Sequence, residues 1–161
     1  MGKIMKKREK LSLYTLALIL ILTITGSTNA LSQNYDPELA AKYGADDYGM
    51  KSYTFVILRT GPNKTEDKDL LAELFRSHME NINKLSKEGR LIVAGPMGKN
   101  KKLYRGIFIL DTQSEEEARE MLKGDRAIAE GIFEADLFTW YGSAALSAYL
   151  EVHEKIAKRN P

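Results

Sequence analysis

The sequence predicts an α+β domain with a four-stranded antiparallel sheet and both of its main helices on one face. Three observations predict this fold class. From residue 52 to 141 the segments follow the order strand, helix, strand, strand, helix, strand. That order is the split βαβ, or ferredoxin-like, arrangement. The chain after residue 30, about 130 residues, has the length of one domain with one core. It has no cysteine, so packing must hold it together.

The first strand and the first helix have the clearest patterns. Residues 53–58 are a β-branched and aromatic run, which predicts a strand with at least one buried face. Residues 67–88 have apolar side chains at spacings of three and four, which predicts a long amphipathic helix. Its apolar stripe consists of Leu71, Leu74, Phe75, His78, Ile82 and Leu85.

The remaining elements follow in order. Residues 91–94 form a short strand that ends at Gly95-Pro96, and residues 104–110 form the next, joined to it as a hairpin. Ser114 and Glu117 have the spacing of a capping box, which predicts a helix start there and a stop at Gly124. A short turn at 126–130, a strand at 132–141 and a final helix at 143–158 complete the chain, and a short helix is expected at 37–42.

Residues 1–30 have the three parts of a cleavable secretory signal. A basic head is followed by an uncharged apolar run at 11–24 and by small residues up to Ala30. The run is about 14 residues, shorter than the roughly 18–20 that a membrane-spanning helix needs. Cleavage after Ala30, or two residues later, would export the protein to the periplasm or beyond the cell. The alternative is an uncleaved membrane anchor. The other divisions are a lead-in at 31–51, a domain at 52–141 and a helical extension at 142–161.

Charge argues against a nucleic-acid partner. Residues 1–30 hold five of the 24 bases and one of the 22 acids, so 19 bases and 21 acids remain and the mature net charge is −2. The basicity therefore belongs to the targeting segment. Cysteine is absent and histidine occurs twice, so we expect no metal site, and no nucleotide or phosphate-binding fingerprint predicts a cofactor. After cleavage we expect no membrane association.

His78 and Asp125 are the candidate catalytic pair. His78 lies on the apolar stripe of the first helix, where an unpaired imidazole would be costly, and Asp125 follows a helix-ending glycine. Neighbouring helices on one sheet face can bring the two together, and a carboxylate fixes which imidazole nitrogen carries the proton. Two structural interpretations remain open: a core histidine bonded to the backbone, and Asp125 as the N-cap of the turn at 126–130. We interpret His153, near the edge of the apolar side of the final helix, as structural.

Several short segments together resemble the YCII-related family. They are residues 77–82, the turn at Ala94-Gly95-Pro96, the strand containing Gly106, Asp125 before a short turn and the final strand ending at Trp140. The resemblance covers roughly residues 52–141. It implies a ferredoxin-like dimeric αβ-barrel with His78 and Asp125 lining a cleft, and Gly95 and Pro96 at its mouth. One kind of member is a dehydrochlorinase of chlorinated aromatic compounds, which implies lyase-like proton abstraction.

Two features depart from that family pattern. Arg126 stands where the family usually has proline, and we expect its guanidinium to bind a carboxylate substrate or to compete with His78 for Asp125. The export signal and the C-terminal helix are additions. The leading hypothesis is a cofactor-independent lyase, isomerase or hydrolase-like enzyme with a small-molecule substrate, in which His78 is the general base or acid and Asp125 orients it. The alternatives are a non-catalytic binding protein and a purely structural dimer. A homodimer is expected because two helices cover only one face of such a sheet.

Overall fold

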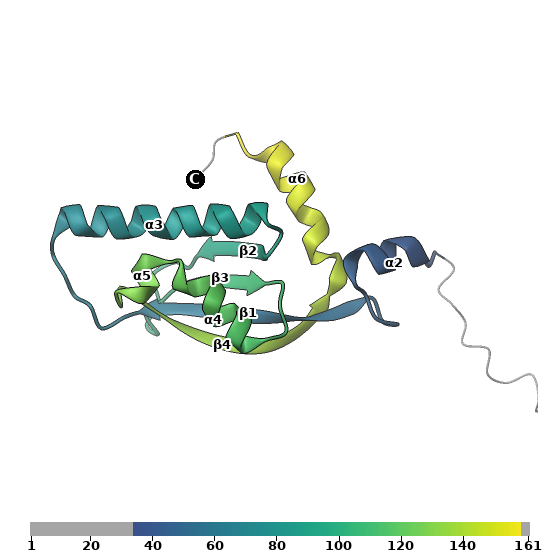
Figure 1. Ribbon diagram of the computed structural model, residues 1–161, viewed down its shortest axis with the longest axis horizontal. Helices are drawn as coiled ribbons and strands as arrows, with labels where there is room; N and C mark the ends of the chain where they lie inside the picture. The colour runs from purple at the N-terminus through teal and green to yellow at the C-terminus, as the bar shows by residue number, and fades with distance from the viewer. Residues whose placement is uncertain (1–33, 159–161) are drawn as a thin grey trace, which may run out of the picture. The chain divides into compact units, whose positions relative to one another are not determined.

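The computed structural model describes residues 34–158, so the predicted signal at 1–30 lies outside the described residues. Figure 1 shows the elements, whose bounds are α2 (Pro37–Tyr43), β1 (Met50–Thr60), α3 (Lys68–Lys87), β2 (Leu91–Pro96), β3 (Tyr104–Leu110), α4 (Glu115–Lys123), α5 (Arg126–Ala129), β4 (Phe133–Ser143), the 3-10 helix η1 (Ala144–Ala148) and α6 (Tyr149–Ile156).

The sheet confirms the predicted fold class. Four strands are hydrogen-bonded in the order β2-β3-β1-β4, and every neighbouring pair is antiparallel. The central strand β1 pairs with β4 along its whole length, from Met50 opposite Ser143 to Thr60 opposite Phe133. Since β2 and β4 are the outer strands, both α3 and the α4–α5 segment cross over the sheet in the ferredoxin-like manner.

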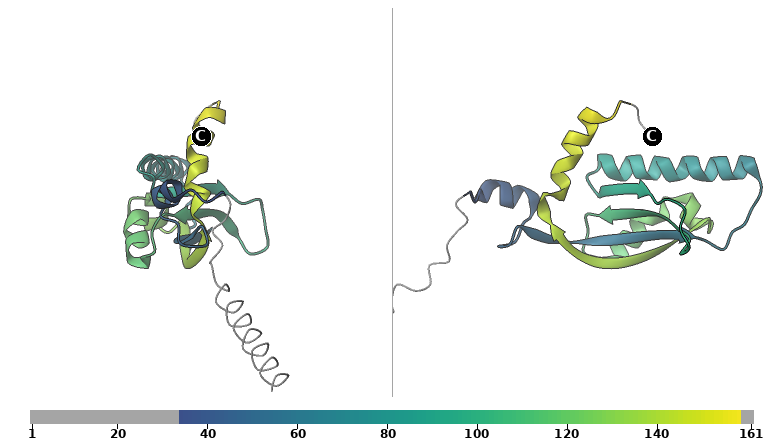
Figure 2. Two further views of the ribbon diagram at one scale, coloured as in Figure 1. Left: turned by 90° about the vertical axis from the view of Figure 1, so that its right-hand side faces the viewer. Right: turned by 180° about the vertical axis from the view of Figure 1, so that it is seen from behind.

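The core lies between one sheet face and the helices. Side chains alternate along β1, so Val56 and Leu58 point to the helical face and are at most 2% exposed. They pack with Leu74 of α3 and with Leu122 of α4. Figure 2 shows α3 and α4 on the same side of the sheet. This shared core fixes how α3 sits against the segment that carries Asp125.

Helix starts are set by side-chain caps, with one difference from the prediction. The Ser114 hydroxyl accepts the Glu117 backbone N–H, as a capping box requires. The Glu117 carboxylate does not reach back to Ser114. It accepts instead from the Thr112 hydroxyl at 2.5 Å and from Arg90 at 2.5 Å, and Thr112 receives the Ser114 N–H. A nearby hydroxyl therefore takes the role that the spacing assigns to glutamate.

The predicted final helix is divided into η1 and α6, which pack on the second sheet face and its edge. Leu146 and Leu150 contact a small cluster built on Tyr53, Ile92 and Ile109. The Tyr149 hydroxyl donates to the Ile92 carbonyl of the outer strand β2 at 2.6 Å. This bond and this packing cover part of an otherwise open edge.

Within residues 34–158, none of the helices combines the length and the apolar character that crossing a membrane requires.

Candidate active site: a His–Asp pair beside an apolar cavity

The structure brings His78 and Asp125 into direct contact. His78 lies midway along α3, and Asp125 lies between α4 and α5, 47 residues further along the chain. The imidazole Nδ1 lies 2.5 Å from the Asp125 carboxylate Oδ2. The His78 side chain is 12% exposed and the Asp125 side chain is fully buried. The pair that the sequence predicts is therefore a buried contact between two elements.

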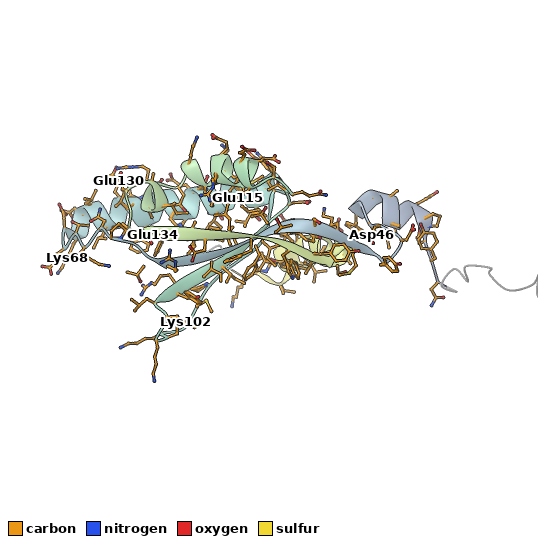
Figure 3. All side chains as sticks on the ribbon, turned by 90° about the horizontal axis from the view of Figure 1, so that it is seen from below. Asp46, Lys68, Lys102, Glu115, Glu130 and Glu134 are labelled. Carbon is orange, nitrogen blue, oxygen red and sulfur yellow. The ribbon has the colours of Figure 1, made fainter. Side chains whose placement is uncertain are left out.

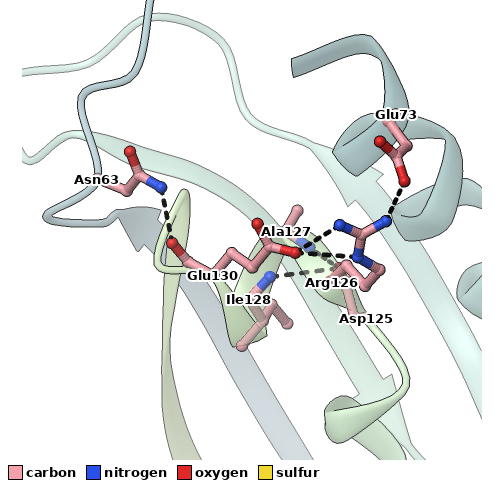
Figure 4. A network of polar contacts seen from close by, with 7 residues as sticks. All are labelled: Asn63, Glu73, Asp125, Arg126, Ala127, Ile128 and Glu130. Carbon is pink, nitrogen blue, oxygen red and sulfur yellow. Dashed lines mark hydrogen bonds and ion pairs between the residues drawn. The ribbon is translucent and has the colours of Figure 1, made fainter. Parts of the chain in front are cut away.

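Both interpretations of Asp125 hold at once, because its two oxygens have different partners. Oδ1 accepts the backbone N–H groups of Ala127 and Ile128, at 3.0 and 3.3 Å, so Asp125 is the N-cap of α5. Figure 4 shows this side of the carboxylate. Oδ2 is left for His78. The cap fixes the carboxylate in one orientation, and that orientation directs Oδ2 at the imidazole.

A second contact between the same elements holds the pair in register. Asn81 lies one helical turn after His78 and is buried, and its side-chain amide donates to the Met121 carbonyl at 3.2 Å. Gly124 sits against this side chain: a Cβ atom there would lie 2.7 Å from the Asn81 Oδ1. Gly124 has an ordinary right-handed helical conformation. Its lack of a side chain thus serves close packing on α3 and not the backbone turn.

The geometry assigns the imidazole tautomer. An ionised carboxylate can only accept hydrogen bonds, so Nδ1 carries the proton that Asp125 receives. Nε2 is then the nitrogen with a free lone pair. No described residue forms a hydrogen bond with Nε2. Every buried side-chain nitrogen or oxygen in the described part of the chain has a partner, so Nε2 is not a buried atom. Nε2 is therefore open to the space beside it.

That space is a cavity of about 410 Å³ between α3 and the strands β2 and β3. Aromatic rings form much of its wall: His78 lies against Phe108 and Phe133, with ring centroids 5.9 and 5.2 Å apart, and Phe75 meets Phe133 edge to face. The lining residues are Leu58, Phe75, His78, Met79, Ile82, Ala94, Gly95, Pro96, Arg105, Gly106, Phe108 and Phe133. Among them only His78 and Arg105 are ionisable. The cavity is thus largely apolar, and His78 is the one lining residue able to accept a proton, because arginine stays protonated.

Gly95 and Pro96 line the cavity, at the end of β2 where the sequence places them. Opposite Pro96 in the sheet lies Gly106, where an added Cβ would come within 2.9 Å of the Gly95 carbonyl oxygen. Because Gly106 has no side chain, the backbones of β2 and β3 can approach closely here and line the cavity together. The aromatic wall was not predicted. Its signal is the alternation that puts Phe108 on the helical face of β3.

Arg126 does not line the cavity. Its guanidinium donates to the Glu130 carboxylate at 2.7 and 2.9 Å and also to Glu73 of α3, as Figure 4 shows. These hydrogen bonds, led by the one to Glu73, raise the Arg126 pKa. The expected competition with His78 for Asp125 is not seen, because two nearer carboxylates hold the arginine. Lys102, in the loop between β2 and β3, does not line the cavity either, and Figure 3 shows it at the tip of this hairpin.

The described residues contain no cluster of three or more histidine, cysteine, aspartate or glutamate side chains able to hold a metal ion. What the arrangement can do is move a proton. A neutral imidazole whose tautomer is fixed by a carboxylate can accept a proton at Nε2, and the carboxylate then stabilises the imidazolium.

The search of curated proteins finds no match. Among solved structures, the chain is similar to a 5-chloro-2-hydroxyhydroquinone dehydrochlorinase from Burkholderia phenoliruptrix AC1100, in complex with 2,5-dihydroxybenzoquinone. The two chains are 18% identical, and the match covers 54% of this chain and 92% of the other with a TM-score of 0.39. The family model of the YCII-related domain matches residues 54–140, which include all four strands of the sheet in whole or in part and the His78–Asp125 pair. The chain belongs to the YCII-related domain family.

Proposed function

We propose that this protein is a cofactor-independent enzyme that moves a proton on a small organic substrate, with His78 as the base. One observation carries the proposal: the imidazole is bonded through Nδ1 to a buried carboxylate and opens through Nε2 to an apolar cavity. The part of the chain that the YCII-related model matches includes both residues of the pair. Asp125 is the positioning residue, since it acts through the imidazole.

The proposed step begins with a substrate whose C–H bond is made acidic by a neighbouring carbonyl group. Nε2 takes the proton, and the electron pair of the broken C–H bond moves into the carbonyl system. In an isomerisation, the imidazolium then returns the proton to a different atom of the substrate. In an elimination, a leaving group departs with its bonding electron pair and takes up the proton from the imidazolium. Neither route requires an oxidant or a bound cofactor, because the substrate carbonyl holds the electrons.

The cavity suits a flat, largely apolar substrate. The rings of Phe108 and Phe133 lie against the imidazole, and Phe75 meets Phe133 edge to face. Aromatic groups prefer offset-stacked or edge-to-face contacts with such rings. A volume of about 410 Å³ falls in the range of small-molecule sites. We therefore propose an aromatic or quinone-like carbon acid as the substrate class.

Solvent exchange tests the chemistry before the substrate is known. A panel of cyclic and aromatic carbon acids is incubated with the protein in D₂O, and loss of C–H signals is followed by proton NMR. We expect enzyme-dependent exchange for at least one compound and no exchange above buffer with His78→Ala. Exchange should be unchanged with Lys84→Ala, because Lys84 is exposed and does not line the cavity. Saturable binding without exchange of any compound would favour the alternative, a non-catalytic binding protein.

We further propose that the protein acts outside the cytoplasm. The support is the basic head, apolar run and small-residue exit of residues 1–30. Intact-mass analysis of protein from the extracytoplasmic fraction tests it. A mass that lacks residues 1–30 or 1–32 is expected, whereas full-length protein held in the membrane fraction would support an uncleaved anchor.

A further inference from the structure

A second cavity of about 440 Å³ lies beside the first, between α3, β2 and α6. Its lining residues are Ile82, Asn83, Ser86, Lys87, Leu91, Ile92, Ala94, Tyr149, Leu150, His153, Glu154 and Ala157. Five of them come from residues 149–157, beyond the part of the chain that the YCII-related model matches. Figure 1 shows α6 rising beside the C-terminal end of α3. This cavity is therefore built partly from the C-terminal extension.

The two cavities are neighbours that share part of their lining. Ile82 of α3 and Ala94 of β2 line both of them. Ile82 lies one helical turn beyond His78 on the same stripe of α3. A molecule that occupied both cavities would contact these two apolar side chains between its ends.

The wall formed by α6 is held in place by specific contacts. The Tyr149 hydroxyl donates to the Ile92 carbonyl at 2.6 Å, and burial raises the Tyr149 pKa. Leu150 packs beside Ile92 in the small apolar cluster on that side of the sheet. One turn after Tyr149, the His153 ring meets the tyrosine ring edge to face, with centroids 6.1 Å apart.

The two cavities differ in chemistry. The first has aromatic walls and His78. The second combines an apolar floor with hydrogen-bonding residues at Asn83, Ser86, Lys87, His153 and Glu154, four of which carry donor groups. A ligand that fills both therefore has an apolar ring at one end and a hydrogen-bond acceptor at the other, joined by a flexible apolar chain.

We infer that the cavity beneath α6 is a subsite for the distal chain of an elongated substrate, namely an aromatic ring that bears an alkyl chain ending in a carboxylate or similar acceptor. The inference rests on the proposed function, in which the ring lies beside His78. The C-terminal extension then sets substrate length, a property that the family-matched part of the chain cannot provide alone.

Calorimetric titration of the full chain with a graded set of phenols tests this. The probes are phenol and phenols whose para chain has two, four or six methylenes before a terminal carboxylate. A methylene buried on an apolar wall strengthens binding about fourfold. We expect affinity to rise by about that factor per methylene up to the length at which the carboxylate reaches the second cavity.

Variants separate the subsite from the His78 cavity. Ser86→Trp fills the second cavity, and we expect it to abolish the gain from the chain while phenol binds as before. Lys84→Trp is the matched control, since Lys84 is exposed on α3 and lines neither cavity. Asn83→Phe fills the same cavity from an exposed position and serves if Ser86→Trp does not fold.

The outcomes distinguish this inference from the proposed function. NMR of the imidazole reports whether the ring lies beside His78. If phenol binds and shifts the His78 resonances but longer chains bind no more tightly, the subsite is overturned and the proposed function stands. The same holds if longer chains gain as much affinity in Ser86→Trp and Asn83→Phe as in the wild type. If phenol and every longer probe leave the His78 resonances unchanged, the ring does not occupy the His78 cavity and both ideas fail. A chain-length gain lost in the cavity-filling variants and kept in Lys84→Trp establishes the subsite.

Discussion

At the scale of single residues, the Asp125 carboxylate connects two otherwise separate functions. Its Oδ1 caps α5 and its Oδ2 holds the imidazole, so the backbone of a short helix determines where Nε2 points. A change at Asp125 that preserves the cap therefore tests the imidazole contact without removing the fold, because one oxygen suffices for the cap.

Asp125→Asn provides that test. Its amide oxygen can still accept from Ala127 and Ile128, while its NH₂ group now donates to Nδ1 of His78. We expect the imidazole proton to move from Nδ1 to Nε2, which faces the cavity. Long-range proton–nitrogen NMR reads the two nitrogens directly, and His153→Gln assigns the spectrum because the chain has only two histidines. Retention of the wild-type tautomer in Asp125→Asn would contradict the proposed orienting role.

Gly124 is a second residue whose role is set by packing. A methyl group there would lie 2.7 Å from the buried Asn81 Oδ1. We expect Gly124→Ala to lower the free energy of unfolding by about 1–3 kcal/mol, the usual cost of overpacking. Gly98→Ala is the matched control, because a methyl group added at Gly98 would meet nothing within 4 Å beyond its chain neighbours. Urea unfolding of both measures the difference; equal stability would mean that Asn81 moves aside freely.

At the scale of elements, periodicity in the sequence was sufficient for every strand and for the helices that form the core. Element ends were less predictable: β1 extends from Met50 to Thr60, beyond the predicted 53–58, because its polar ends are held by backbone pairing with β4. The final helix begins with η1, which its apolar spacing did not indicate.

In the site, too, some contacts could be predicted from nearby residues in the sequence and others could not. The His78 and Asp125 positions follow from helix spacing and the family resemblance. The ion pairs of Arg126 could not be predicted in this way, since one of its two carboxylate partners, Glu73, lies 53 residues away in the sequence. Only the ion pair with Glu130, four residues further along the chain, could be predicted from the spacing in the sequence. The α6 cavity likewise depends on where the extension docks, which the pattern of α6 alone does not specify.

One contact between distant elements has a pH dependence that can be measured. The Tyr141 hydroxyl at the end of β4 donates to the Asp46 carboxylate ahead of β1, which raises the pKa of Tyr141 to about 12 and lowers that of Asp46. The tyrosine contribution to stability is complete below pH 10, its ordinary pKa, and is lost as pH rises toward about 12. The aspartate contribution is present above its ordinary pKa and is lost as pH falls through the lowered value.

Alkaline titration of the tyrosinate absorbance tests this contact. The difference between wild type and Tyr141→Phe isolates one tyrosine, and we expect its midpoint near pH 12. In Asp46→Asn we expect the midpoint to move down toward about 10, the ordinary value for tyrosine. An unchanged midpoint in Asp46→Asn would assign the shift to another cause.

At the scale of the whole molecule, the second sheet face is covered unevenly. The η1–α6 extension packs on the part that includes Tyr53 and Ile109. Further along the same face, Phe138 is 50% exposed and lies opposite the partly buried Phe55 in the sheet. Near the end of this face, Arg59 forms ion pairs with both Glu134 and Asp136. An apolar centre bordered by satisfied charges is typical of a protein interface.

We expect this face to pair with a second copy of the chain, and Phe138→Glu tests that expectation. A charge at the apolar centre would have to be buried without a partner in the dimer, which is strongly unfavourable, whereas the monomer leaves it in water. Sedimentation velocity should therefore show a dimer for wild type and a monomer for Phe138→Glu. Leu103→Glu is the control, because Leu103 is 62% exposed and belongs to the loop between β2 and β3, not to a strand of the sheet. A monomeric wild type would instead mean that the extension has replaced the second copy as the cover of this sheet.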